Sequence, residues 1–284
     1  SLTSFGAPQI HGQRQYLSNT IEDFRTAESG AKFNPDWGLR GGKVVHVDNN
    51  FYHKNQTSLN HYWNINDKSN LSTALYASWG NGAGNSRGGD SSLFNVRIGG
   101  DDQPIDIDNI VNINRANGEM GLEAQSYLRA GFNNHSWYGI LSTYDIDLNE
   151  NLKFIGGVDL RTYTGYHYTE VTDLLGGAYA FDNNDANNPN NAAKVGDKIS
   201  YNNDGEVGWQ GVFTQLEYDK DRWSAFISLA ASNTSYVRVD NFLLDSEFRG
   251  HSLHMLSTGM LQLFRSFPDL LPPIVRSSRF RVHY

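Results

Sequence analysis

The fold is decided by residues 56–80, which read QTSLNHYWNINDKSNLSTALYASWG. Residues 56–65 predict a strand, residues 66–70 a short polar turn, and residues 71–80 a returning strand. In the returning strand, alternate positions are largely apolar: Leu71, Thr73, Leu75, Ala77 and Trp79. The positions between them are small or polar, apart from Tyr76. This period of two predicts a strand with one apolar face and one small or polar face.

The same pattern occurs twice more along the chain. The second hairpin is predicted at residues 137–148 and 152–169, and the third at 207–218 and 223–239. This gives about six strands in three hairpins, in addition to a strand end at residues 1–6. On residues 152–169 the face opposite the apolar one carries charged and polar side chains, which predicts contact with water: Lys153, Asp159, Arg161, Tyr163 and His167.

Short turns at one end and long polar loops at the other are typical of bacterial outer-membrane barrels. Strands of about ten residues are long enough for a tilted membrane crossing. Six strands are fewer than the roughly eight of the smallest known barrels, and an open sheet would leave unpaired edges in lipid. The predicted fold is therefore all-β: a segment of an antiparallel, up-and-down transmembrane β-barrel with long extracellular loops that contain short helices.

Composition is consistent with this prediction. Only 38% of the 284 residues are hydrophobic, whereas 15 Tyr, 15 Phe and 6 Trp make aromatic residues abundant. Such a chain suits strands with one wet face and rings at the membrane interfaces. The net charge of −8 and the scattered basic residues argue against nucleic acid as a partner.

Two short helices are expected in the long polar segments. Residues 19–25 resemble a helix start, with acidic residues in the first turn, and Gly30 is expected to end it. A second helix is expected near residues 108–116, closed by Gly118.

The chain changes character after Asp245. Residues 1–245 are interpreted as a partial barrel and residues 246–284 as an atypical tail, with helix-like apolar spacing near Leu253 and a truncated or frame-shifted reading as an alternative. Residues 1–4 lack the basic and apolar regions of a signal peptide. Either a signal was removed or the chain starts within a longer protein, and the second interpretation is favoured.

Several stretches together resemble TonB-dependent outer-membrane receptors of the Bacteroidetes type. They are FGAPQ (5–9), HGQR (11–14), NPDWG (34–38), YHK (52–54), SLNHYW (58–63), LSTALY (71–76), EVTDLLGG (170–177), GDKI (196–199) and YNNDG (201–205). The resemblance implies a 22-stranded barrel plugged by an N-terminal domain. It further implies uptake of a siderophore, metal complex, vitamin or glycan, driven by the TonB complex, and a location in the outer membrane. These 284 residues depart from the family pattern, since they include neither the plug, nor the short segment that TonB grips, nor the remaining strands of the barrel. The tail after Asp245 does not resemble the family either.

The sequence favours a transporter over an enzyme. No local signature marks a nucleophilic triad or a pair of glycosidase carboxylates. The histidines show no HxH or HExxH spacing and cysteine is absent, so neither a metal site nor a cofactor is expected.

Ligand contact is the one role that can be assigned to particular side chains. Aromatic and basic groups in the loops and upper lumen could stack on and pair with an anionic or sugar-like ligand. The candidates are His11, Arg14, Trp37, His53, Arg161, Tyr163 and His167. The alternative is that these side chains only pack loops together or line the wall. Two other functions stay open: a passive porin-like barrel, and a secreted soluble β protein that binds glycans.

Overall fold

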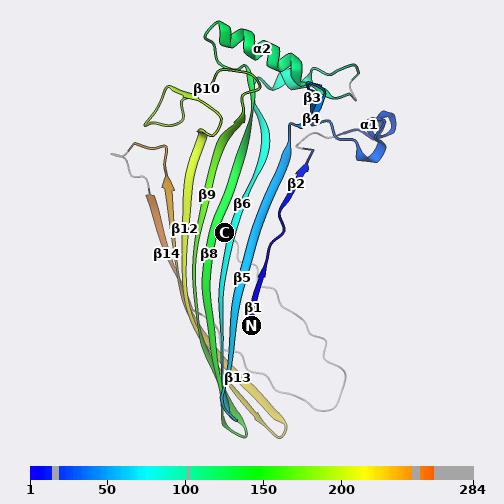
Figure 1. Cartoon of the computed structure of the whole chain (residues 1–284). Helices are drawn as coiled ribbons and strands as arrows, with labels where there is room; N and C mark the ends of the chain where they lie inside the picture. The colour runs from blue at the N-terminus through cyan, green and yellow to red at the C-terminus, as the bar shows by residue number, and fades with distance from the viewer. Residues whose placement is uncertain (15–18, 101–102, 245–249, 259–284) are drawn as a thin grey trace.

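The structure is a computed structural model that describes residues 1–14, 19–100, 103–244 and, for the backbone alone, 250–258. A nine-stranded antiparallel sheet dominates it (Figure 1). The strands are, in spatial order, β1 (Leu2–Phe5), β5 (Asn49–Asn66), β6 (Ser69–Gly89), β8 (Ser126–Asn149), β9 (Leu152–Asp173), β12 (Lys198–Lys220), β13 (Trp223–Asp240) and β14 (Gly250–Thr258), with β2 (Gln9–Gly12) also paired to β5. Within the described residues the two edges of this sheet do not pair with each other, so the sheet is open.

The three predicted hairpins and the all-β antiparallel class are confirmed, but the prediction of about six strands is wrong. β1 confirms the strand end predicted at residues 1–6, and the sheet gains β2 and β14 at its edges. β9 and β13 have 22 and 18 residues, close to the 18 and 17 predicted, whereas β5, β6, β8 and β12 have 18 to 24, about twice the predicted length. Their outer halves lose the apolar alternation while the backbone pairing continues, so the side-chain pattern underestimates their length.

The helix-like interpretation of the tail near Leu253 is also wrong for residues 250–258. These residues form β14, which pairs with β13 from Ala231↔Thr258 to Val239↔Gly250. Backbone pairing with an existing edge outweighs the helix-like spacing near Leu253, because the edge offers a full row of hydrogen-bonding groups. The rest of the tail, residues 259–284, lies outside the described residues.

The long segments between hairpins contain small elements that pattern reasoning treated as loop. β3 (Trp37–Arg40), β4 (Lys43–His46) and β7 (Ile105–Asp106) form one small sheet, and β10 (Ala180–Asp182) and β11 (Asn191–Ala193) form another. Two 3₁₀ turns, η1 (Gly30–Lys32) and η2 (Ser91–Asn95), accompany them. No helix in the described part of the chain is both long and apolar enough to cross a membrane.

Both predicted helices are present, with different ends. α1 (Ile21–Thr26) starts with a capping box between Thr20 and Asp23, and it ends at Ala27 rather than at Gly30. α2 (Ile107–Glu119) is capped by Asp106 and runs through Gly118, so that glycine does not close it. The turn after α2 instead uses Gly121, whose φ is +74°.

α2, η2 and the sheet of β3, β4 and β7 form a cap across the loop ends of β6, β8 and β9 (Figure 1). Its core consists of buried apolar side chains from all these parts: Val47, Phe94, Ile105, Ile107, Ile110, Val111, Leu128 and Leu175. Leu128 belongs to β8 and Leu175 follows β9, so the cap shares one core with the main sheet. The cap is therefore fixed to the strand ends by burial of apolar surface.

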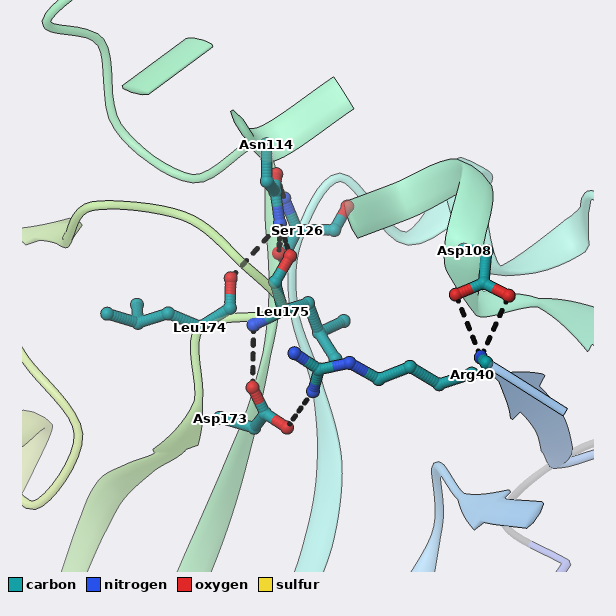
Figure 2. Close-up of polar contacts among 8 residues, drawn as sticks. Arg40, Asp108, Asn114, Ser126, Asp173, Leu174 and Leu175 are labelled. Atoms are coloured by element: carbon teal, nitrogen blue, oxygen red, sulfur yellow. Dashed lines mark hydrogen bonds and ion pairs between the residues drawn. The ribbon is translucent and has the colours of Figure 1, made fainter. Parts of the chain in front are cut away.

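The buried side chain of Asn114 fastens α2 to β8 and to the turn after β9 (Figure 2). Its Nδ2 donates to the carbonyl oxygens of Ser126 (2.7 Å), Leu174 (3.1 Å) and Leu175 (3.1 Å). Its Oδ1 accepts from the backbone N–H groups of Gln125 (2.8 Å) and Ser126 (3.3 Å). One amide thus satisfies five backbone groups, among them the turn where Leu175 has a φ of +48°.

Three further polar contacts hold the parts of the cap together and connect the cap to β9 (Figure 2). The Arg40 guanidinium forms an ion pair with Asp173 at 2.9 Å, and the other carboxylate oxygen of Asp173 accepts from the Leu175 N–H at 2.7 Å. Asp108, in the first turn of α2, accepts the Gly41 N–H with both oxygens at 3.0 and 2.9 Å. These contacts set the position of the β3–β4 turn relative to α2 and β9.

We predict that Asn114→Ala loosens the cap by about 3 kcal/mol, because several buried backbone groups lose their partners at once. Hydrogen exchange of the amides in α2 and residues 124–128 measures the opening free energy. Asn112→Ala, an exposed asparagine on the same helix, is the matched control and is expected to change it by less than about 0.5 kcal/mol. Equal effects of the two substitutions would contradict the anchoring role.

A buried charge cluster lies where the segment before β5 meets β6. Asp36 and Asp48 are both fully buried. Arg87 forms an ion pair with Asp36 and lies 3.5 Å from an Asp48 oxygen, with its guanidinium 5.6 Å from the Phe94 ring centroid. Neither Asp48 oxygen accepts a hydrogen bond from the described residues. Burial first, and then the Asp36 charge, raise the pKa of Asp48 from 3.8 to about 6.

This raised pKa makes the cap more stable at mildly acidic pH. The folded protein takes up a proton on Asp48 below about pH 6, whereas the unfolded chain does so only below about 3.8. The stabilisation that comes from protonating Asp48 is complete below pH 3.8 and is lost as the pH rises through 6. The free energy of unfolding therefore differs by about 3 kcal/mol between the two limits. Asp48→Asn is expected to stabilise the cap at pH 7 and to flatten the dependence between pH 5 and 7. Hydrogen exchange at pH 5 and pH 7 tests this, with the exposed Asp67→Asn as the control. If the cap's stability depends on pH in Asp48→Asn as it does in the unaltered protein, the assignment to Asp48 is refuted.

Candidate functional site

The main sheet has two faces of opposite character, and the strand register assigns side chains to them. Directly paired residues in an antiparallel sheet point to the same side. Leu75 pairs with Ile140, which pairs with Leu160, and these define the Leu75 face. Tyr76 pairs with Gly139, which pairs with Arg161, and these define the Arg161 face.

The Leu75 face exposes large apolar side chains and carries no Asp, Glu, Lys or Arg over residues 71–79, 138–144, 152–162, 210–218 and 223–233. Its side chains are far from buried: Leu75 is 44% exposed, Val212 57% and Leu229 55%. A contiguous apolar surface of this kind needs an apolar partner, because water contact with so much apolar area is unfavourable.

Aromatic rings border this apolar surface at both ends. Toward the cap lie Trp79 and Tyr138, which meet edge to face at 5.8 Å and share a 2.8 Å hydrogen bond from Trp79 Nε1 to the Tyr138 hydroxyl. Toward the short turns lie Trp63, Tyr144, Tyr218 and Trp223. The spacing of the rings along β6 gives the height of the apolar band: Trp79 lies eight positions after Leu71, which pairs with Trp63. At about 3.4 Å per residue and a tilt of about 40°, the band is about 21 Å high.

The Arg161 face carries a row of aromatic and charged side chains across the middle of the sheet. Tyr76, Gly139, Arg161 and Trp209 are successive partners in one row. The Arg161 guanidinium lies 5.7 Å from the Trp209 ring centroid and also forms an ion pair with Asp159 on its own strand. The Trp209 Nε1 is buried and has no hydrogen-bond partner among the described residues.

Glycines in this face make room for the rings. A Cβ at Gly139 would lie 2.2 Å from Cζ of Tyr76, and one at Gly157 would lie 2.3 Å from Cζ of Phe213. A Cβ at Gly80 would lie 2.2 Å from Cε1 of His135. Each ring therefore lies over a glycine of the neighbouring strand, which keeps it flat against the sheet.

The next row toward the cap continues this aromatic surface. Trp137 meets Tyr76 edge to face at 5.6 Å, and Tyr163 stacks on His135 at 5.7 Å with an interplanar angle of 23°. Toward the short turns the face becomes charged, with Lys153 paired to Asp145 at 3.4 Å. The face thus offers rings for stacking, a guanidinium and a charged region toward the short turns, which suits transient contact with a polar or partly aromatic solute.

The structure brings together three of the seven predicted ligand-contact residues. Arg161, Tyr163 and His167 share the Arg161 face on β9, and His167 Nδ1 lies 2.7 Å from Asn133 Oδ1. His53 lies on β5 with the alternation of the Leu75 face, so it is on the opposite side.

The other three candidates lie elsewhere. His11 is on β2 and pairs with Asn50, and Trp37 is on β3 and pairs with His46. The Arg14 guanidinium lies 5.5 Å from the Phe24 ring centroid. Sequence reasoning did not select Tyr76, Trp137, His135 or Trp209 as site residues. The available signal was the alternation of rings with glycines on adjacent predicted strands.

Over the described residues, no three His, Cys, Asp or Glu side chains gather as metal ligands would. No protein-family model matches this chain, and neither a curated protein nor a solved structure does. The functional interpretation therefore depends on the two faces of the sheet.

We predict that Gly139→Ala destabilises the hairpin of β8 and β9 by about 1–3 kcal/mol, because the new methyl overlaps the Tyr76 ring. In a Tyr76→Ala background the same change is expected to be nearly neutral. Urea unfolding of the four variants in detergent gives the coupling energy. Gly205→Ala on β12 is the control, since nothing lies within 4 Å of its Cβ. Equal penalties in both backgrounds would contradict the ring-over-glycine packing.

Proposed function

We propose that this chain forms part of the wall of an outer-membrane barrel that takes up a ligand, in the manner of a TonB-dependent receptor. In this proposal the Leu75 face contacts lipid and the Arg161 face lines the lumen. The cap stands on the extracellular side, and the short turns face the periplasm.

The observation that carries the proposal is the difference in charge between the two faces. Over the same rows, one face has no charged side chain, while the other has Asp145, Lys153, Asp159, Arg161 and Glu217. A soluble sheet with an apolar face would bury that face against a second layer. Here the described residues place nothing over it, and its rings lie near both ends, as in barrel girdles.

The height of the apolar band supports the same proposal. The estimate of about 21 Å is close to the roughly 25 Å expected of an outer-membrane barrel. The strands extend well beyond this band toward the cap, where they carry polar residues and join the loops. Extended, polar strand ends of this kind are expected on the extracellular side.

The sequence resemblance adds the mode of transport: import of a siderophore, metal complex, vitamin or glycan, with energy from the TonB complex through a plug. Arg161, Tyr163 and the rings beside them would contact the ligand inside the lumen. A passive porin-like barrel is the second candidate, since its wall would have the same two faces.

Uptake in cells separates these functions. The protein is expressed from its own gene, and growth is measured with iron complexes, cobalamin or glycans as the limiting nutrient, with and without TonB. The proposal expects TonB-dependent growth on one class and no steady conductance in planar bilayers. A constant open conductance would favour the porin. A monomer that stays in solution without detergent would contradict both membrane functions.

We predict that arginine is far more costly on the Leu75 face than on the Arg161 face. Leu75→Arg and Leu229→Arg should each cost about 2–4 kcal/mol if these positions lie near the bilayer midplane. Ser72→Arg and Ser228→Arg, on the other face, should cost much less. Folding titrations in lipid vesicles measure the difference. Similar costs on both faces would remove the basis of the proposal.

A further inference from the structure

A pocket of about 530 Å³ lies at the loop end of the sheet, and none of its lining residues belongs to the row around Arg161. It is formed where the end of β6, the segment after α2 and β10 meet. Its lining residues are Gly89, Asp90, Asn117, Leu122, Glu123, Ala124, Gln125, Tyr127, Tyr179 and Phe181. We call it the tyrosine pocket.

Three aromatic rings line the tyrosine pocket, and their backbone is well anchored. The Tyr127 ring lies over Gly88, where a Cβ would be 2.3 Å from the ring. The Tyr179 carbonyl accepts the Ala124 N–H at 2.7 Å, and the Phe181 N–H donates to Glu123 Oε2 at 3.0 Å. Phe181 is 48% exposed, so its ring is available to a ligand.

Two carboxylates accompany the rings. Asp90 accepts the Ser92 N–H at 2.9 Å and the Gln125 side-chain amide at 3.3 Å. These hydrogen bonds lower the pKa of Asp90, so it is ionised at neutral pH. Glu123 is exposed and contributes the second carboxylate.

No Lys, Arg or His lines this pocket, and within the described part of the chain neither Asp90 nor Glu123 forms an ion pair. A cation does lie beside it: the Lys194 ammonium is 5.7 Å from the Tyr179 ring centroid and donates to the Ala178 carbonyl. The lining itself therefore has two negative charges that no lining group balances.

We propose that the tyrosine pocket binds an organic cation, a small molecule whose ammonium nitrogen carries apolar substituents. The negative faces of aromatic rings attract such a group, and the carboxylates add charge complementarity. The apolar substituents would displace water from the rings, which a metal ion or free ammonium cannot do. An anionic solute would be repelled by both carboxylates, and a neutral one could donate hydrogen bonds to them but would lack the attraction between opposite charges.

This inference does not depend on the transport proposal, because it uses only the chemistry of the pocket. Its test compares two probes of the same shape. Choline and 3,3-dimethyl-1-butanol differ only in that a quaternary nitrogen replaces a quaternary carbon. Binding to the full chain in detergent micelles is followed by chemical-shift changes of labelled tyrosine rings.

Choline is expected to bind at least tenfold more tightly than its neutral isostere and to shift tyrosine resonances. Equal affinity for both probes, or no choline binding at tens of millimolar, would overturn the inference. This comparison uses the unaltered protein, so it stays decisive if a variant does not fold.

Variants then locate the site. Glu123→Gln and Asp90→Asn keep the shape and remove one charge each, and each should weaken choline binding about fivefold or more without affecting the isostere. Tyr179→Leu should also weaken it, whereas Tyr179→Phe keeps the ring and should not. Glu119→Gln, an exposed carboxylate of α2 outside the pocket, is the control. Choline affinity that drops equally in Glu119→Gln would contradict the site.

Discussion

The pairing of long antiparallel strands is the constraint on which the rest of the structure depends. Once β6, β8, β9, β12 and β13 are hydrogen-bonded in register, every side chain is assigned to one of two faces, and a shift by one residue would exchange the faces. The register brings Leu75, Ile140 and Leu160 to one side and Tyr76, Gly139 and Arg161 to the other. The apolar band and the aromatic wall are therefore two results of the same backbone hydrogen bonds.

The same register explains where rings and glycines occur. A wall of paired strands leaves little lateral space, so a large ring fits flat only where the neighbouring strand has no Cβ. Gly139 beneath Tyr76 and Gly157 beneath Phe213 meet this requirement. At the loop end, the strands extend past the apolar band. There the cap is held by its apolar core and by the five hydrogen bonds of Asn114.

The sequence predicts those parts of the fold whose side-chain pattern lies within one short segment of the chain. The three hairpins were predictable because apolar alternation and a short polar turn are contained in about 25 residues, as in residues 56–80. The full length of β8 was not, since its outer half is held by backbone pairing with β6 and β9 and carries no apolar alternation. β14 was not, since the apolar spacing near Leu253 resembles that of a helix. Of the candidate site residues, Arg161, Tyr163 and His167 lie on one face because they alternate along one strand. His53 lies on the opposite face, which is set by its pairing with β6 and not by its residue type.

The central claim is that one face of this sheet contacts lipid and the other contacts water. The chain contains no cysteine, so single cysteines at positions 71 to 79 can each carry a spin label in lipid vesicles. The measurement compares the accessibility of each label to oxygen, which partitions into lipid, and to a water-soluble nickel chelate. The account predicts oxygen maxima at 71, 73, 75, 77 and 79 and nickel maxima at the positions between them. Labels that are accessible to the nickel chelate at every position would contradict it.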